Sequence, residues 1–387
     1  MNTKPCGQGE PEPLQQVERV FVSHRGRKLL YFSGCDYYRM ASHPRVVEAL
    51  QRGAQEYGLN VAASRLTTGN HRLYAQLESA LARFFDAPAA ILVPTGYVSD
   101  LVAAQALAGT STHALLDDAA HVALQEAAQL LGAKVMPFRS RDPKSLELAA
   151  RGCGTNAKIL VLTDGMFARD GSVAPLAEYL EVLPRSARIL LDDAHGAGVL
   201  GHTGKGTLEH ARLLDKKLPG GRRSGPVTRA RIIQTITLSK AFGVYGGAIL
   251  GTNALRQRVI RHSQQFIGST PLPLPLACAA LASLRVHAAG SQMRKRLREN
   301  ADYLKGILRS AGLEIPELPG PIVYFLPRGP AQSRRLQAAL LAAGIFPPFL
   351  RYPGGPTSGY FRFVISSEHT RTHLNAVAAA VLAVAGS

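Results

Sequence analysis

The chain has 387 residues, of which 46% are hydrophobic and 19% charged, and its formal net charge is +18. This length and composition exclude wholesale disorder and allow more than one domain core. Excess positive charge favours polyanionic partners, namely nucleic acid, an acidic membrane surface or a phosphate-bearing small molecule. The basic residues are spread along the sequence, and their modest clusters at 216–231, 256–261 and 294–298 contain no aromatic residues. We therefore expect a solvated basic surface that helps to attract a phosphorylated ligand, and neither a nucleic-acid nor a membrane partner.

Four cysteines occur far apart, without a Cys-x-x-Cys pair: Cys6, Cys35, Cys153 and Cys278. This spacing argues against a disulfide framework and against a zinc site, so we expect no bound metal and a reducing compartment. Residues 1–13 are polar and rich in proline and glycine, without the apolar core of a signal peptide. The longest apolar stretch, Ala376–Ala385, is too short to cross a bilayer, and we expect a cytoplasmic location.

The first elements in chain order are short strands and two helices. Residues 1–18 are expected to form a loose tail. Arg19–Phe32 alternates apolar and polar residues, which predicts two short strands joined by a turn at His24–Arg27. His43–Tyr57 and Arg72–Phe85 place apolar residues at helical spacing, so each predicts a helix.

A series of short, largely apolar segments follows, each typical of a buried strand: Ala89–Val93, Ala114–Leu116, Lys134–Phe138, Ile159–Thr163, Arg188–Leu191, Ile232–Leu238 and Ala248–Leu250. Amphipathic segments lie between most of them, for example Val98–Leu107, Val122–Leu131 and Leu176–Leu183. Apolar strands that alternate with helices indicate an α/β fold with a mostly parallel sheet covered on both faces.

The alternation ends near Gly251, and a different pattern begins. Residues 272–311 are rich in helix signals, and three later segments indicate a smaller α/β domain: Ile322–Leu326, Arg334–Ala343 and Tyr360–Ile365. We therefore predict three parts: an N-terminal segment, 1–45, that packs with the small domain; a large domain, 46–271; and a small C-terminal domain, 272–387.

Two of the predicted strands end in groups that can act together on a cofactor, and in open α/β sheets ligands bind outside the carboxyl ends of the strands. Lys240 follows Ile232–Leu238 and precedes a run of glycines, where a desolvated amine can serve as a Schiff-base nucleophile. Asp192 follows Arg188–Leu191, and its carboxylate can pair with a protonated pyridoxal ring nitrogen, while His195 can donate to the ring's phenolate oxygen. Taken singly, a surface lysine in a turn and a capping or metal-binding aspartate are the simpler interpretations.

Two further strand ends supply candidate binding groups. Thr95, Gly96 and Tyr97 follow Ala89–Val93 and open a helix, whose N–H groups and dipole favour a phosphate. The alternative is an ordinary N-cap by Thr95. His121 follows another strand and could stack on a planar cofactor or simply start a helix. Because these groups are the parts of one cofactor site at successive strand ends of one sheet, coincidence is the minority explanation.

Three stretches make the sequence resemble the α-oxoamine synthases, which belong to the fold-type I pyridoxal-phosphate enzymes. These stretches occur in the family's order and spacing: Leu162–Leu176, Leu190–Gly201 and Thr237–Gly247. Weaker matches are Phe32–Tyr37, Ser64–Glu78, Gly268–Pro273 and Arg362–His369. The resemblance runs from about Phe32 to about His369. It implies a fold-type I transferase, pyridoxal 5'-phosphate as cofactor, and a homodimer with shared active sites.

The resemblance also implies roles for individual residues, and four are expected to be catalytic. Lys240 would hold the cofactor covalently and then act as acid and base at the substrate's α-carbon. Asp192 would pair with the pyridine nitrogen, His195 with the phenolic oxygen, and His121 would stack on the ring. The other implied cofactor-binding residues are Thr95, Gly96, Tyr97, Asp164 and Thr237, together with Thr270 from the partner subunit.

At the substrate end, the resemblance implies that Arg362 binds the substrate carboxylate, because a guanidinium fork suits a planar anion. Ser64 is the second implied substrate-binding residue. The sequence departs from the family pattern at several positions: Cys35 replaces an asparagine, Ala62 and Ala63 replace glycines, Tyr74 a histidine, Ala168 a serine and Asp193 a glutamate, while Gly354 and Gly355 occupy a segment in which oxononanoate synthases carry a threonine. The implied cofactor chemistry is intact, and the substrate end is altered.

The implied reaction is a decarboxylating condensation of a small amino acid with an acyl thioester, carried on coenzyme A or a carrier protein. The family includes 8-amino-7-oxononanoate synthase, glycine C-acetyltransferase, 5-aminolevulinate synthase and serine palmitoyltransferase. The first, an enzyme of biotin biosynthesis, is the first expectation because it is the commonest bacterial member. An aminotransferase or another acyl-independent enzyme on the same scaffold is the alternative. His195 argues against it, because aminotransferases commonly contact the phenolic oxygen with a tyrosine from another part of the chain. A basic nucleic-acid-binding protein on a vestigial enzyme fold is a remote alternative, against which the complete cofactor set argues.

Overall fold

The computed structural model describes residues 12–214, 229–351 and 355–385, and it divides into two compact units. The larger unit comprises Met40–Phe167 and Val173–Ser291, and the smaller comprises Met1–Arg39, Ala168–Ser172 and Gln292–Ser387. The boundaries therefore differ from those expected after residues 45 and 271. Helix α11 (Leu274–Ala289) lies in the larger unit because it packs against α1 (Pro44–Tyr57) and α2 (Arg72–Phe84).

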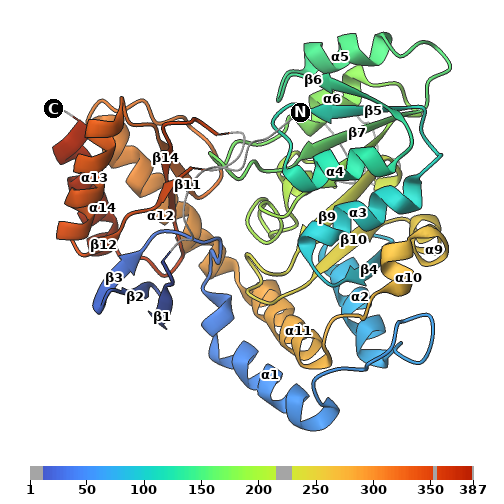
Figure 1. Cartoon of the computed structure of the whole chain (residues 1–387), viewed down its shortest axis with the longest axis horizontal. Coiled ribbons are helices and arrows are strands. Elements are labelled where there is room, and N and C mark those ends of the chain that lie inside the picture. Colours follow the sequence, from blue (N-terminus) through green and yellow to red (C-terminus); the bar gives the residue numbers. More distant parts are fainter. Residues whose placement is uncertain (1–11, 215–228, 352–354, 386–387) are drawn as a thin grey trace. The chain divides into compact units, whose positions relative to one another are not determined.

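The larger unit is built on a seven-stranded sheet with the order β4-β10-β9-β8-β7-β5-β6 (Figure 1). Its strands are β4 (Ala89–Val93), β5 (His113–Asp117), β6 (Lys134–Phe138), β7 (Ile159–Asp164), β8 (Arg188–Asp192), β9 (Ile232–Thr237) and β10 (Gly247–Gly251). The pairs β5–β6, β5–β7, β7–β8 and β8–β9 are parallel, whereas β10 is antiparallel to both of its neighbours. The predicted mostly parallel sheet is therefore confirmed.

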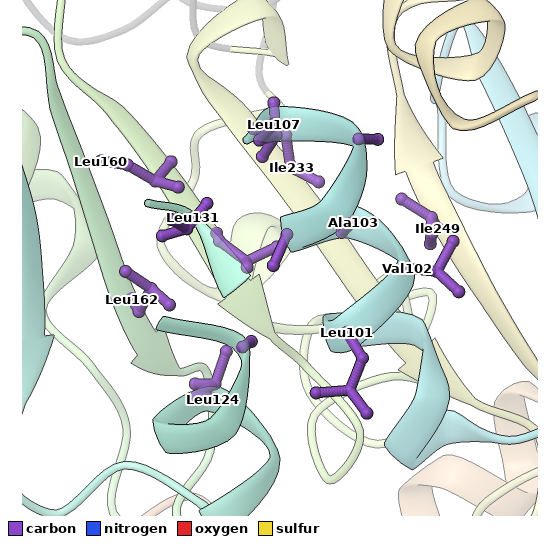
Figure 2. Packing of buried hydrophobic residues seen from close by; sticks show 14 of the residues in the cluster. Leu101, Val102, Ala103, Leu107, Leu124, Leu131, Leu160, Leu162, Ile233 and Ile249 are labelled. Carbon is purple, nitrogen blue, oxygen red and sulfur yellow. The ribbon is translucent and has the colours of Figure 1, made fainter. Parts of the chain in front are cut away.

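Helices cover both faces of this sheet, and the strands alternate between two apolar cores. On β7, Leu160 and Leu162 belong to one core, while Ile159 and Val161 belong to the other. The first core is closed by α3 (Gly96–Leu107), α4 (Val122–Leu130), α9 (Asn253–His262) and α10 (Gln264–Gly268) (Figure 2). The second is closed by α5 (Pro143–Arg151), α6 (Leu176–Val182) and the short α7 (Thr207–His210). Burial on both faces explains why these strands are nearly continuous apolar runs.

The strand directions bring the predicted site residues to one edge of the sheet. Since β10 is antiparallel to both β4 and β9, β4 points the same way as the parallel strands. The carboxyl ends of β4, β5, β7, β8 and β9 therefore share an edge, and β10 begins there. Open α/β sheets bind their ligands at such an edge.

In its described residues, the smaller unit contains two small sheets and three helices. One sheet has the order β1-β2-β3-β12, from β1 (Gln15–Glu18), β2 (Phe21–His24), β3 (Arg27–Tyr31) and β12 (Ile345–Phe346). The other has the order β11-β14-β13, from β11 (Ile322–Phe325), β14 (Tyr360–Val364) and β13 (Phe349–Leu350), and the helices are α12 (Ser291–Ser310), α13 (Pro330–Ala342) and α14 (Arg371–Ala385). The predicted turn at His24–Arg27 is confirmed. The expected loose tail is wrong for residues 15–18, because they pair with β2.

Some sequence features fall on residues that the structure does not describe. Cys6, Gly354 and most of the basic cluster at 216–231 lie outside the described residues. Helix α14 contains the longest apolar run, and among the described helices none has both the length and the hydropathy that crossing a bilayer requires. Within the same ranges, no group of three or more His, Cys, Asp or Glu side chains is arranged to hold a metal ion.

Candidate active site

The start of α3 forms a cradle for an anionic group. Thr95 caps the helix, because its side-chain oxygen accepts a hydrogen bond from the Val98 amide at 3.1 Å. Gly96 is the first helical residue, and Tyr97 is 39% exposed in the same turn. The alternative interpretation of Thr95 as an N-cap is thus confirmed, and it is compatible with phosphate binding because the N–H groups of the first turn lack partners within the helix.

Two glycines allow this turn to lie directly against the central strands. A Cβ on Gly96 would come within 2.7 Å of Thr237 Oγ1 and 3.1 Å of Thr237 Cα. A Cβ on Gly247 would come within 2.6 Å of the Thr95 carbonyl carbon. The Thr237 hydroxyl lies 2.6 Å from the Ser239 hydroxyl. The cradle is therefore lined by Thr95, Gly96 and Thr237, which the sequence proposed as cofactor-binding residues, and any side chain at Gly96 or Gly247 would displace it.

Lys240 lies in a tight turn just beyond β9. Its carbonyl accepts a hydrogen bond from the Gly243 amide at 3.0 Å, and the Leu238 amide donates to Gly246 O at 2.9 Å. Gly243 has a φ of +64°, and a Cβ there would press against the backbone of Met40. The lysine side chain is half-buried, so the turn holds an amine at the sheet edge without enclosing it completely.

Asp192 and His195 follow β8 at the same edge, and both are buried. The Ala194 amide donates to Asp192 Oδ1 at 2.9 Å, which fixes the carboxylate at the strand end. In the β8–β9 register Asp192 is the partner of Thr235, two residues before the end of β9. Asp192 and His195, the two expected partners of a pyridoxal ring, therefore lie in one short segment at the end of β8.

His121 lies at the end of the neighbouring strand and starts α4. Its Nδ1 accepts a hydrogen bond from the Ala123 amide at 3.3 Å, and its backbone amide donates to Asp164 Oδ2 at 2.8 Å. Its ring is 6.1 Å from the Tyr97 ring in an edge-to-face arrangement. Burial, reinforced by the charge of Lys240 and opposed by Asp192, lowers the pKa of His121. A neutral imidazole at neutral pH suits stacking on a planar ring.

These side chains interact electrostatically, so the predicted set is brought together. Burial and the charge of Asp192 raise the pKa of Asp164 well above its usual range, whereas the Asp164 hydrogen bond with His121 and the charge of Lys240 lower it. Asp164, Asp192, Lys240 and His121 therefore lie within interaction range at one edge of the sheet.

Three predicted residues belong to other segments of the chain than these strand ends. Thr270 is exposed in the irregular segment between α10 and α11. Ser64 lies in a turn, where its carbonyl accepts from the Thr67 and Gly69 amides at 3.1 and 3.0 Å. Arg362 belongs to the smaller unit, on β14.

Arg362 is held by two positions at which the sequence departs from the family. Its Nη1 donates to the Ala168 carbonyl at 3.1 Å, and its Nη2 lies 3.9 Å from Cys35 Sγ. Its Nε is buried without a hydrogen-bond partner among the described residues. Within the smaller unit, the altered residues Cys35 and Ala168 thus surround the guanidinium that the resemblance assigns to the substrate.

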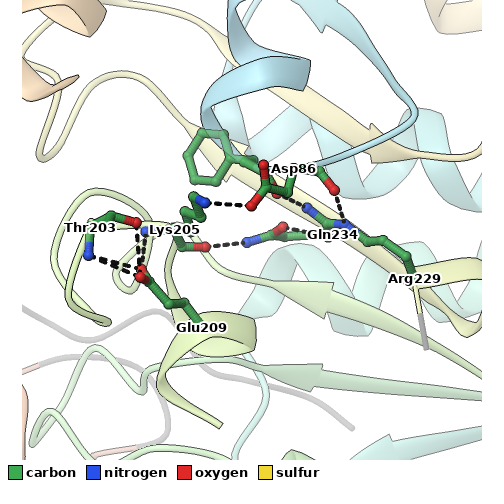
Figure 3. A network of polar contacts seen from close by, with 7 residues as sticks. Asp86, Thr203, Lys205, Glu209, Arg229 and Gln234 are labelled. Atoms are coloured by element: carbon green, nitrogen blue, oxygen red, sulfur yellow. Dashed lines mark hydrogen bonds and ion pairs between the residues drawn. The ribbon is translucent and has the colours of Figure 1, made fainter. Parts of the chain in front are cut away.

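Asp193 anchors a buried hydrogen-bond network that the sequence did not predict. In the sequence, this residue was noted only as the replacement of a family glutamate. Its carboxylate accepts from the Thr207 amide and hydroxyl at 2.9 and 2.6 Å and from Gln234 Nε2 at 2.7 Å. Gln234 Oε1 in turn accepts from Arg229 Nη1 at 2.8 Å, and Figure 3 shows how Gln234 also reaches the Lys205 carbonyl. The network ties the segment after Asp192 to β9. The adjacency of Asp193 to Asp192 was the signal that could have indicated it.

The residues at this edge fit a pyridoxal-phosphate group. The cradle at Gly96 and Thr237 has no room for a side chain, and it lies at a helix N-terminus, where the helix dipole favours a phosphate. The Asp192 carboxyl at the end of β8 forms no ion pair with a described residue, so it is available as the partner of a protonated ring nitrogen. The half-buried amine of Lys240 is at the same edge. Cradle, carboxylate and amine match the three functional parts of that cofactor.

Comparisons with known proteins identify the family of the chain. The family model for aminotransferase class I and II matches residues 27–381. An 8-amino-7-oxononanoate synthase from Thioalkalivibrio sulfidiphilus is 34% identical over 370 residues, covering 95% of this chain and 89% of that protein. Another from Stutzerimonas stutzeri is 35% identical over 364 residues, covering 93% and 89%.

Solved structures give the same result. A serine palmitoyltransferase from S. paucimobilis aligns with a TM-score of 0.86 at 25% identity, covering 96% of this chain and 91% of that one. An 8-amino-7-oxononanoate synthase from Francisella tularensis shares the fold, with a TM-score of 0.76 at 22% identity, covering 92% and 97%. Because the family model and the relatives span nearly the whole sequence, the resemblance is confirmed: the chain belongs to the aminotransferase class I and II family and, within it, to the pyridoxal-phosphate-dependent α-oxoamine synthases.

Proposed function

We propose that this enzyme condenses alanine with a seven-carbon ω-carboxyacyl thioester and releases CO2 and the thiol. The proposal follows from the product named for its relatives. In 8-amino-7-oxononanoate, carbons 8 and 9 with the amine correspond to alanine without its carboxyl group. Carbons 1–7 correspond to a dicarboxylic acyl unit. The new bond joins the α-carbon to the thioester carbonyl carbon, the C–S bond breaks, and the α-carboxyl group leaves as CO2.

The observation that carries the proposal is the convergence of Lys240, Asp192, His195 and His121 at one sheet edge. The bound cofactor supplies an electron sink for the pair left when the α-proton is removed. Lys240 is the only lysine that follows a central strand at this edge within the described residues, so we assign it the cofactor linkage and the transfer of the α-proton at Nζ. The carboxylate of Asp192 would favour the protonated form of the ring nitrogen, and His195 would donate a hydrogen bond to the phenolic oxygen.

Substrate binding is assigned to Arg362 and Ser64. A guanidinium offers parallel N–H donors to a carboxylate, and the buried Arg362 Nε lacks a hydrogen-bond partner in the described part of the chain. The ω-carboxylate of the acyl donor and the phosphates of a coenzyme A or carrier-protein arm would also be attracted by the net charge of +18. We further propose a cytoplasmic homodimer, in which the exposed Thr270 reaches the phosphate of the partner subunit's cofactor.

The proposal is tested with purified enzyme, pyridoxal phosphate and a panel of alanine, glycine and serine against acyl thioesters of different lengths. The expected result is highest turnover for alanine with the seven-carbon ω-carboxyacyl donor, with CO2 and thiol released in equal amounts and the product identified by mass spectrometry. Thioesters on coenzyme A and on a carrier protein are compared in parallel. Amino transfer to a 2-oxo acid without thiol release would contradict the proposal, and the Lys240→Ala variant is the matched inactive control.

A further inference from the structure

A buried carboxyl group lies inside the central helix of the larger unit. Asp100 is the only charged residue of α3, and it is 1% exposed. Most of the other residues of the helix are apolar or small, and the helix lies in the first core, against β9 and β10. An isolated ionised carboxylate at such a position carries a large desolvation penalty. The placement of Asp100 therefore calls for a specific partner.

The partners of Asp100 place it beside Asp192. Its Oδ1 accepts a hydrogen bond from the Thr235 hydroxyl at 2.6 Å, whereas its Oδ2 is fully buried and has no donor among the described residues. Thr235 is the register partner of Asp192 in the parallel pair β8–β9. Paired residues of parallel strands point to the same face, so the Asp192 side chain faces α3 as Thr235 does. After burial, the charge of Asp192 is the largest influence on the pKa of Asp100, which it raises.

This arrangement cannot hold two negative charges. Both carboxylates are acceptors only, and two such groups in contact share a proton. Burial first, then the charge of Asp192, raise the pKa of Asp100 well above its usual range, and Asp164 adds to this while Thr235 opposes it. Lys240, the cation at this edge, interacts with Asp164 and His121. The buried Oδ2 of Asp100, which has no donor among the described residues, is the position at which a shared proton would satisfy both carboxyl groups.

We propose that Asp100 is a neutral carboxylic acid whose Oδ2–H donates a hydrogen bond to the Asp192 carboxylate, which makes Asp100 a positioning residue for the cofactor's ring nitrogen. The donated bond stabilises the ionised form of Asp192, so that the shared proton stays on the ring nitrogen and not on Asp192. Thr235 fixes the orientation by binding the other oxygen of Asp100. The inference deepens the proposed function, because it rests on the role assigned there to Asp192.

The test uses variants that separate a neutral donor from a negative charge. Asp100→Asn keeps a donor for Asp192 and an acceptor for Thr235, whereas Asp100→Leu keeps the volume and removes both. Cofactor affinity is measured by absorbance titration of the cofactor-free enzyme, and the absorbance of the bound cofactor is followed from pH 6 to 9. We expect Asp100→Asn to keep the dissociation constant within about threefold and the pH titration unchanged, and Asp100→Leu to weaken binding roughly tenfold or more and shift the titration.

Two results would overturn the proposal. If Asp100→Asn behaves like Asp100→Leu, a negative charge and not a neutral donor is required. If Asp100→Leu binds and titrates normally, Asp100 does not act on Asp192. Asp100→Ala, which also lacks a donor and an acceptor, replaces the leucine variant should that chain fail to fold by circular dichroism. Thr235→Val is the matched control, with a smaller shift expected. Because the titration uses no acyl thioester, it remains informative if the proposed substrates are wrong.

Discussion

The glycine at the start of α3 offers a direct test of the phosphate cradle. In Gly96→Ala, the new Cβ would lie 2.7 Å from Thr237 Oγ1, about 0.7 Å inside an ordinary contact, and nearer still to Thr237 Cβ. The neighbour is a strand residue with a short side chain, so the helix start must move. Overpacking of this kind costs about 1–3 kcal/mol, which corresponds to roughly 5- to 150-fold in an equilibrium constant.

We expect the displacement to appear mainly in cofactor binding, because the N–H groups of Gly96 and Tyr97 move away from Thr237. The cofactor-free Gly96→Ala enzyme should bind pyridoxal phosphate roughly 10- to 100-fold more weakly in an absorbance titration. Gly306→Ala is the matched control, since Gly306 is also helical and a Cβ there meets nothing within 4 Å. The control should bind the cofactor normally and unfold at a slightly higher temperature, by about 1 kcal/mol of stability. Unchanged cofactor affinity in Gly96→Ala would refute the assignment of the cradle.

Three further predictions concern catalytic groups and stability. Borohydride reduction of the yellow enzyme should fix the cofactor on the peptide that contains Lys240, and a label on any other lysine would disprove that assignment. Asp192→Asn should fold and bind the cofactor but lose roughly 10²–10³-fold in turnover, because a neutral amide holds the protonated ring nitrogen poorly; near-normal turnover would transfer this role to another group. Burial lowers the pKa of Lys305 to about 8, although its ammonium donates to Leu318 O and Gly320 O at 2.6 and 2.5 Å. Since the folded state binds this proton less tightly than the unfolded chain, stability is full above pH 10.5 and is lost as pH falls through 8, by about 3 kcal/mol. Denaturant unfolding at several pH values should show that the free energy of unfolding of the wild type falls as the pH is lowered from 10.5 to 8. Lys305→Met should lack this pH dependence, and an equal dependence in both proteins would contradict the explanation.

The sequence determined most of the large sheet and the main catalytic candidates. Strand β4 begins and ends at the predicted residues, because a strand buried on both faces must be almost wholly apolar. Strand β6 also has the predicted ends, although it is a partly exposed edge strand. The polar candidate residues directly follow these apolar segments in the sequence, so Asp192 and Lys240 could be proposed from their sequence positions alone. The mostly parallel strand directions could be predicted from the alternation of strands with helices, because a helical crossover connects parallel strands.

Only the tertiary structure decided which groups lie against one another. Asp100 is one acidic residue in an apolar helix by sequence, and its link to Asp192 depends on the β8–β9 register and on the packing of α3. The contacts of Arg362 with Cys35 and Ala168 join residues separated by 327 and 194 positions. The compact units also divide the chain at other residues than the predicted domains, because α11 packs on α1 and α2 and its own pattern does not indicate this. Periodicity reports which face of an element is buried, whereas the partner across that face depends on the arrangement of the whole chain.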